Sequence, residues 1–235
     1  MKKFNFFIQT AIVLLGVSTL VGFNNNYYEN ENATEKEKVY ELMNNSDAVK
    51  REFVEKLLKK EYRSEVNYYK LKSDDGSINY TEISGDDLDK GIMIDGQLKE
   101  NGGFIFISDG DNRYWLNFNK NNYYTDKIND HKIAKITTSN SLTYGEKEVI
   151  KVFGDLPRTV ERIDGGYKTI LSDELNDGYE IYDKNGNFIL SYLDNSQGKV
   201  TTTWLKSTDD VEGVYNYYLS KISGMTQAKS IEEVK

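Results

Sequence analysis

The loop Asp183-Lys184-Asn185-Gly186-Asn187 is the stretch whose residue types come nearest to a metal site, because oxygen-bearing side chains stand at alternate positions. An EF-hand calcium loop requires glycine at position six, glutamate at position twelve and a helix on each side. Here Phe188 stands sixth, Asp194 stands twelfth, and the flanking residues alternate as strands do. The loop therefore predicts a hairpin turn. Residues 74–76 and 109–112 are interpreted in the same way, and the acidic run 86–89 as a solvated loop.

Catalytic machinery has few candidates in a chain with one histidine and no cysteine. His131 lies in the polar stretch 129–132, which is typical of an exposed side chain. The lack of cysteine excludes a thiol nucleophile, and one histidine cannot supply a zinc site. Neither a serine nucleophile elbow nor a phosphate-binding glycine loop occurs. We therefore assign no catalytic, cofactor-binding or metal-ligating residue, and expect no cofactor.

A pair of carboxylates is the remaining catalytic option, because glycosidases place two acids across the scissile bond. With 38 acidic side chains in the chain, the sequence does not select two of them. A carbohydrate-active hydrolase is kept as an alternative. It requires a cleft with two facing acids and aromatic walls.

Aromatic side chains are the strongest candidates for a binding surface in this chain of 18 tyrosines and 2 tryptophans. Successive side chains of a strand point to opposite faces, so a tyrosine doublet in a strand turns one ring outward. Tyrosine is enriched at contact surfaces, whereas the tryptophans also suit a core. The predicted binding surface comprises Tyr68, Tyr69, Tyr123, Tyr124, Trp115 and Trp204.

The segment from Phe4 to Phe23 carries no charge and follows Lys2 and Lys3. A positive start before an apolar run is typical of a signal peptide, and a helix of this length spans roughly 30 Å, enough for a bilayer core. Because no good small-residue cleavage site precedes residue 24, two outcomes stay open for residues 1–23: a cleaved signal or a retained membrane anchor. Both place the remaining chain outside the cytoplasmic membrane.

The charge balance restricts the partners of this chain. A formal net charge of −8 argues against nucleic acid and against anionic lipid headgroups, so we expect membrane contact only through residues 4–23. An exported domain without cysteine is stabilised by its core alone. With its many Asn, Lys and Tyr residues, the composition is typical of a bacterial exported protein.

Helical spacing dominates the start of the exported part. Residues 24–33 are typical of a polar linker, and Thr34 with Glu37 predicts an N-cap and capping box. Apolar residues between 39 and 58 then repeat at helical spacing. The repeat is interrupted where Ser46 or Asp47 caps a second helix. We expect this amphipathic segment to cover a sheet.

From residue 64 the apolar period changes to two and turn signals recur, which predicts an antiparallel meander. The predicted strands cover residues 65–71, 78–83, 91–95, 103–108, 113–119, 133–138, 159–163, 167–172, 179–182, 188–193 and 200–205. Residues 104–107 are apolar on both faces and are the best candidate for a central strand. We expect residues 119–130 to be an exposed loop and 146–153 a short helix. The only proline marks a lobe break near 154–157.

The C-terminal part predicts one more amphipathic helix. Ser207 with Asp210 forms a capping-box pattern, and Gly224 is a plausible stop. Residues 225–235 are expected to be a flexible tail. The fold class is α+β: an N-terminal hydrophobic helix, an amphipathic helical segment, an antiparallel β-sheet meander and a C-terminal amphipathic helix. Residues 34–224 form the extracytoplasmic domain.

These observations favour an exported, non-catalytic protein that binds a partner or ligand at the cell surface, either secreted or tethered to the membrane. The expected partner is a protein or a cell-wall or carbohydrate ligand. The alternatives are the carboxylate-pair hydrolase and a secreted toxin or effector. Only size and export support the effector, and a cell-binding assay distinguishes it.

Overall fold

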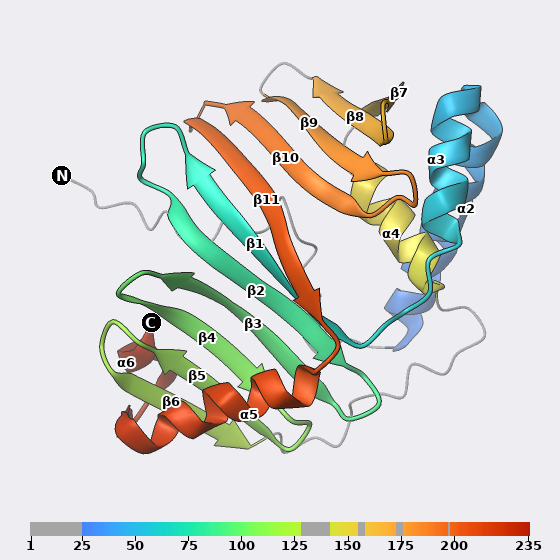
Figure 1. Cartoon of the computed structure of the whole chain (residues 1–235). Helices are drawn as coiled ribbons and strands as arrows, with labels where there is room; N and C mark the ends of the chain where they lie inside the picture. Colours follow the sequence, from blue (N-terminus) through green and yellow to red (C-terminus); the bar gives the residue numbers. More distant parts are fainter. Residues whose placement is uncertain (1–24, 128–141, 155–157, 173–175, 197) are drawn as a thin grey trace. The chain divides into compact units, whose positions relative to one another are not determined.

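A computed structural model describes residues 25–127, 142–154, 158–172, 176–196 and 198–235. These residues form an α+β protein with five α-helices and a twelve-stranded sheet (Figure 1), which confirms the predicted class. The hydrophobic segment 1–23 and the predicted strand 133–138 lie outside the described residues. No helix in the described ranges is both long and apolar enough to cross a membrane.

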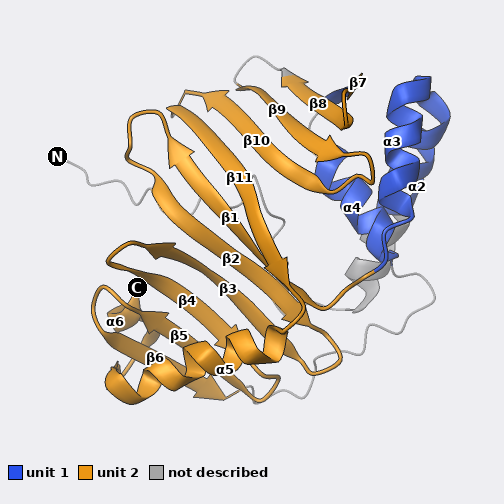
Figure 2. Ribbon diagram, in the orientation of Figure 1, with its two compact units in different colours: residues 1–61, 137–160 blue, residues 62–136, 161–235 orange. Residues whose placement is uncertain are grey.

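The chain divides into two compact units (Figure 2). Unit 1 comprises residues 1–61 and 137–160, and unit 2 comprises residues 62–136 and 161–235. Of the expected lobe break near 154–157, residues 155–157 lie outside the described residues.

Unit 1 contains α2 (Asn25–Asn45), α3 (Ala48–Leu58) and α4 (Tyr144–Phe153). The predicted break between the first two helices is confirmed: Asp47 caps α3 by accepting a 2.9 Å hydrogen bond from the Lys50 backbone N–H. Phe53 of α3 is fully buried, and its ring centroid lies 6.1 Å from that of Phe153 in α4.

The start of α2 differs from the expectation. We expected a linker over residues 24–33 and an N-cap at Thr34, but Thr34 lies inside a helix that begins at Asn25. Extending an existing helix adds one hydrogen bond for each residue fixed, so a polar flank can join an amphipathic helix without an apolar period of its own.

Helix α4 confirms the short helix expected at residues 146–153. Its start lies two residues earlier because Thr143 and Glu146 form a capping box. The Thr143 N–H donates to Glu146 Oε2 at 2.6 Å, and the Glu146 N–H donates to Thr143 Oγ1 at 3.2 Å.

The sheet joins two meanders. Its strands are β1 (Glu65–Ser73), β2 (Asn79–Asp87), β3 (Ile92–Lys99), β4 (Gly102–Ser108), β5 (Asn112–Asn117), β6 (Asn122–Lys127), β7 (Arg158–Ile163), β8 (Gly166–Ser172), β9 (Asn176–Asp183), β10 (Phe188–Asn195), β11 (Gly198–Thr208) and β12 (Thr226–Gln227). Their order is β12-β6-β5-β4-β3-β2-β1-β11-β10-β9-β8-β7. The antiparallel pair β1–β11 therefore connects strands that are far apart in the sequence.

One face of the sheet, here named the core face, carries the main hydrophobic core of unit 2. Helix α5 (Val211–Lys221) packs on this face against β1–β4 (Figure 1). The fully buried core side chains include Val66, Ile83, Ile105, Ile107 and Leu116. Each such aliphatic side chain contributes about 1.5–3 kcal/mol by leaving water. Strand β4 is an interior strand, as expected for residues 104–107.

Helix α5 is capped by one residue of the predicted pair. Asp210 accepts a 2.9 Å hydrogen bond from the Gly213 N–H, whereas Ser207 belongs to β11, so the predicted capping box is wrong. The Tyr215 hydroxyl donates to Asp109 Oδ2 at 2.7 Å and fixes α5 to the β4–β5 turn. Burial and this hydrogen bond raise the pKa of Tyr215.

Two segments expected as irregular contain regular elements. Residues 122–127, inside the predicted loop 119–130, form β6, so that prediction is wrong over this part. Residues 225–235, expected as a flexible tail, contain β12, which pairs parallel to β6, and α6 (Ile231–Val234). The backbone of β12 pairs with β6, and Ala228 and Val234 are buried, but two separate apolar side chains do not make an apolar period in the sequence. Other contacts are hydrogen bonds between side chains and backbone. An example is Asn117 Nδ2, which donates to the Val234 carbonyl at 2.6 Å.

Candidate functional site

A groove lies on the core face of the sheet, next to the main core of unit 2. Its volume is about 600 Å³, within the range of small-molecule sites. It is lined by Tyr68, Lys70, Asn79, Thr81, Ile83, Leu98, Lys99, Glu100, Leu205 and Lys206. We call it the lysine groove. Ile83 belongs to the hydrophobic core, and Tyr68 and Leu98 pack against it, so the floor of the groove is apolar and supported from below.

The groove is assembled by the β1–β11 pairing. Tyr68 of β1 lies opposite Ile83 of β2 on one side and opposite Lys206 of β11 on the other. A bulge in β11 leaves Leu205 without an opposite residue, and this side chain is 48% exposed at the groove. The site therefore combines an apolar floor with an exposed apolar side chain at its edge.

The lysines are the unusual feature of the groove. Lys70, Lys99 and Lys206 line it together with a single acid, Glu100, in a chain whose net charge is −8. None of the three forms an ion pair with another described residue. Lys206 Nζ lies 4.8 Å from the centroid of the Tyr68 ring, a cation–π contact. The groove is therefore positively charged within an acidic protein.

Tyr68 also supplies a hydroxyl group to this site. Burial raises its pKa, and the nearby phenol of Tyr217 on α5 raises it further. Tyr217 itself is 55% exposed, and Lys221 Nζ lies 4.3 Å from its ring centroid. At neutral pH the Tyr68 phenol is uncharged and can donate a hydrogen bond to an anion.

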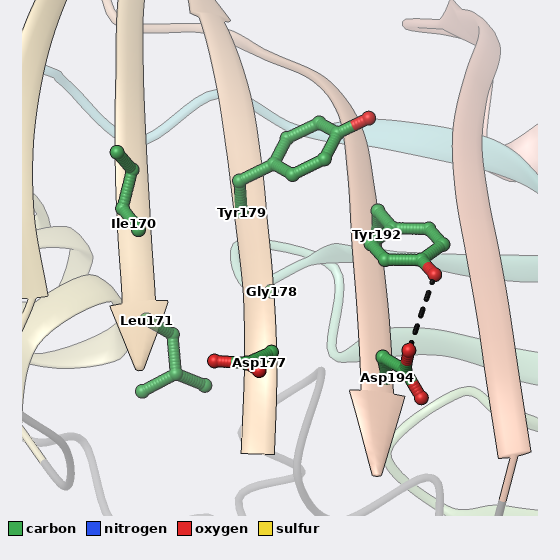
Figure 3. Close-up of a pocket in the computed structure, with 7 residues that line it drawn as sticks. All are labelled: Ile170, Leu171, Asp177, Gly178, Tyr179, Tyr192 and Asp194. Atoms are coloured by element: carbon green, nitrogen blue, oxygen red, sulfur yellow. Dashed lines mark hydrogen bonds between the residues drawn. The ribbon is translucent and has the colours of Figure 1, made fainter. Parts of the chain in front are cut away.

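A second, smaller hollow of about 280 Å³ lies over β8, β9 and β10 (Figure 3). The rings of Tyr179 and Tyr192 stack across β9 and β10, with centroids 5.6 Å apart and an interplanar angle of 26°. Asp177 and Asp194 are register partners on the same two strands. Figure 3 shows both acids beside the tyrosines, and the Tyr192 hydroxyl donates to Asp194 Oδ2 at 3.5 Å. We call this hollow the tyrosine pocket.

The predicted binding residues do not form one surface. Register partners share a face, so Tyr68 and Tyr123 lie on the core face, where Tyr123 packs against the hydrophobic core. The other four lie on the opposite face, here named the reverse face: Tyr69, Tyr124, Trp115 and Trp204.

On the reverse face, two of the predicted residues are in contact. The Trp115 ring centroid lies 5.6 Å from that of Tyr124 and 5.2 Å from that of Phe106. These three rings are half-buried and form a row across β4, β5 and β6. Asp95 continues the row on β3, and burial raises its pKa. Tyr69 and Trp204 are register partners elsewhere on this face.

The loops considered for metal binding act as turns. Asp183 accepts hydrogen bonds from the backbone N–H groups of Asn185 and Asn187, both at 2.8 Å, as an Asx turn requires. Among the described residues, no group of His, Asp or Glu side chains is arranged to hold a metal ion. His131 lies outside the described residues.

Of the predicted binding residues, Tyr68 lines the lysine groove, whereas sequence reasoning missed the lysines of that groove and the whole tyrosine pocket. Tyr179 and Tyr192 each lie in a predicted strand, but they are separated along the chain and are not part of a doublet. The signal that was available is the alternation of Lys70 and Lys72 with apolar residues in β1, which places lysines on one face of a strand.

No family model matches the chain, and no curated protein matches it. Among solved structures, it is similar to an uncharacterized conserved protein from Thermus thermophilus, with a TM-score of 0.40, 8% identity, and coverage of 67% of this chain and 85% of that one. It is also similar to the Pseudomonas aeruginosa MucA/MucB complex, with a TM-score of 0.32, 11% identity, and coverage of 67% of this chain and 54% of that one. A third similar structure is a DUF1329 family protein from Desulfovibrio piger ATCC 29098, with a TM-score of 0.25, 8% identity, and coverage of 74% of this chain and 99% of that one. These TM-scores lie below 0.5, so the similarities carry no argument about activity.

Proposed function

We propose that this chain is an exported, non-catalytic binding protein that holds an anionic ligand in the lysine groove. The observation that carries this proposal is the convergence of Lys70, Lys99 and Lys206 on an apolar floor without ion pairs among the described residues. Neighbouring cations repel one another, and a bound anion relieves that repulsion while accepting hydrogen bonds from them. The apolar floor of the groove can pack against an apolar part of the same ligand.

The uncharged segment 4–23 supports export, so the ligand belongs outside the cytoplasmic membrane. The protein is then secreted, or tethered to the membrane by residues 1–23. An acidic group on a cell-surface protein or on a cell-wall polymer is the type of anion that the groove would meet there.

The proposal predicts that the groove lysines control anion binding. Benzyl phosphate combines a dianionic head with an apolar ring, and benzyl alcohol is the same ring without the charge. In isothermal titration calorimetry with the full chain, benzyl phosphate should bind at least about tenfold more tightly than benzyl alcohol. The triple variant Lys70→Gln, Lys99→Gln, Lys206→Gln should lose this difference.

A matched control keeps the change in net charge constant. Lys127, Lys184 and Lys229 belong to unit 2, are exposed, lie outside the groove and form no side-chain hydrogen bond or ion pair among the described residues. Their triple replacement by Gln should leave the affinity for benzyl phosphate within about twofold, because distant surface charges are screened. Equal losses in both triple variants, or no preference for the phosphate, would refute the groove as an anion site.

A carboxylate-pair hydrolase is the second candidate, and the tyrosine pocket is the observation that favours it. Asp177 and Asp194 face each other across β9 and β10, and retaining glycosidases hold their two acids about 5–5.5 Å apart. Steady turnover of an oligosaccharide by the full chain, abolished by Asp177→Asn, would establish this activity. Binding without turnover would leave the non-catalytic proposal in place.

A further inference from the structure

The tyrosine pocket and the lysine groove lie on the same face of one sheet. Tyr179 is the register partner of Tyr192, which in turn is opposite Thr201 of β11, and Thr201 is opposite Lys72 of β1. Lys72 lies two residues after Lys70 in β1, so both share the core face with the groove. A row of residues across four neighbouring strands therefore connects the two hollows.

The two hollows are also close together. Only β11 separates β1, which carries Lys70, from β10, which carries Tyr192. Neighbouring strands are about 4.8 Å apart, so these two strands are roughly 10 Å apart. Thr201 and Thr203 present their hydroxyls on the same face between them, and both are half-buried. One ligand of modest length can reach both hollows.

The chemistry of the two hollows differs. The lysine groove offers cations to an acidic group, whereas the tyrosine pocket offers two carboxylates and two phenol rings. Ionised carboxylates only accept hydrogen bonds, so this pocket suits a ligand rich in hydroxyl donors. The intervening threonines both donate and accept. Lys199 Nζ lies 3.2 Å from Asp194 Oδ2 and partly offsets the charge of the acid pair.

We infer that the two hollows form a single binding surface for an acidic oligosaccharide, whose acidic group lies among the groove lysines and whose hydroxyl-bearing ring lies against Tyr179 and Tyr192. This inference rests on the proposed function, because it assigns a ligand class to the same groove. An acidic peptide would satisfy the lysines, but its carboxylates would be repelled by Asp177 and Asp194. The saccharide satisfies both hollows.

Three probes with the same number of residues test the assignment by calorimetry on the full chain. They are an oligosaccharide of five N-acetylglucosamine residues that ends in one glucuronic acid, a neutral hexamer of N-acetylglucosamine, and hexaglutamate. The acidic oligosaccharide should bind at least about tenfold more tightly than the neutral hexamer and than hexaglutamate. The double variant Asp177→Asn, Asp194→Asn should weaken binding of the acidic oligosaccharide about tenfold and leave benzyl phosphate unchanged.

The control variant removes two acids elsewhere in unit 2: Asp164→Asn with Asp209→Asn, both exposed and outside the two hollows. It should leave the affinity for the acidic oligosaccharide within about twofold. The inference is overturned if the Asp177 and Asp194 variant binds that probe as the natural chain does, or if hexaglutamate binds equally well. Either result leaves the anion groove intact. Failure of benzyl phosphate to bind would instead remove the proposed function.

Discussion

Replacement of Gly145 by alanine should lower the free energy of unfolding of unit 1 by about 3 kcal/mol. A Cβ at this position would lie 2.3 Å from the Leu58 carbonyl oxygen and 2.6 Å from its carbon, both backbone atoms. Backbone atoms cannot rotate away, so α4 must shift relative to α3, and overpacking of this kind costs up to about 3 kcal/mol. Urea unfolding followed by the circular dichroism of the helices measures the loss.

Gly224 provides the matched control, because a Cβ there meets no atom within 4 Å and its backbone is not left-handed. Gly224→Ala should leave the urea concentration at the unfolding midpoint almost unchanged or raise it slightly, since alanine reduces the entropy of the unfolded chain. Equal stability of the two variants would show that α3 and α4 do not pack as closely as described.

The second large effect is expected at Asn117, a buried residue of β5. Its Nδ2 donates to the Val234 carbonyl at 2.6 Å, and its Oδ1 accepts from the backbone N–H groups of Asn119 and Lys120 at 2.9 and 3.0 Å. Asn117→Ala leaves these groups without their partner. Of these groups only the Val234 carbonyl is buried, whereas Asn119 and Lys120 are exposed and their N–H groups can bind water instead. We expect a loss of about 1–3 kcal/mol, the cost of one unsatisfied buried group. Differential scanning calorimetry measures the decrease in stability.

Limited proteolysis tests whether Asn117 holds helix α6, separately from its hydrogen bonds to the turn after β5. Release of α6 should expose the chain after Ala228 to cleavage in the alanine variant. Asn216 is exposed on α5, forms no side-chain hydrogen bond among the described residues, and serves as the control. Asn216→Ala should stay within about 0.5 kcal/mol of the natural chain and remain uncleaved. Protection of the C-terminus in both variants would contradict the role of Asn117.

The spacing of apolar residues in the sequence predicts most of the helices and strands. Alternation predicted the first hairpin because β1 and β2 each have one face against the core. It failed for β6, whose core face carries Tyr123 and Thr125 and whose pairing with β5 determines its conformation. Tertiary pairing thus replaced local propensity at that strand.

The candidate site was harder to predict, because its parts come from distant positions. Lys70, Lys99 and Lys206 meet only after β1 pairs with both β2 and β11. A sequence pattern reports the face of one strand, and it does not report which strand will be its neighbour. For the same reason the tyrosine doublets did not define a surface: Tyr68 and Tyr69 point to opposite faces.

Methyl NMR of the full chain tests the central claim, an anion site in the lysine groove, most directly. With isoleucine and leucine methyl groups labelled, addition of benzyl phosphate should shift the signals of Leu98 and Leu205, which line the groove. The signals of Leu57 in unit 1 and of Leu116 in the core should stay in place. Unchanged Leu98 and Leu205 signals at a phosphate concentration that saturates binding by calorimetry would contradict the account.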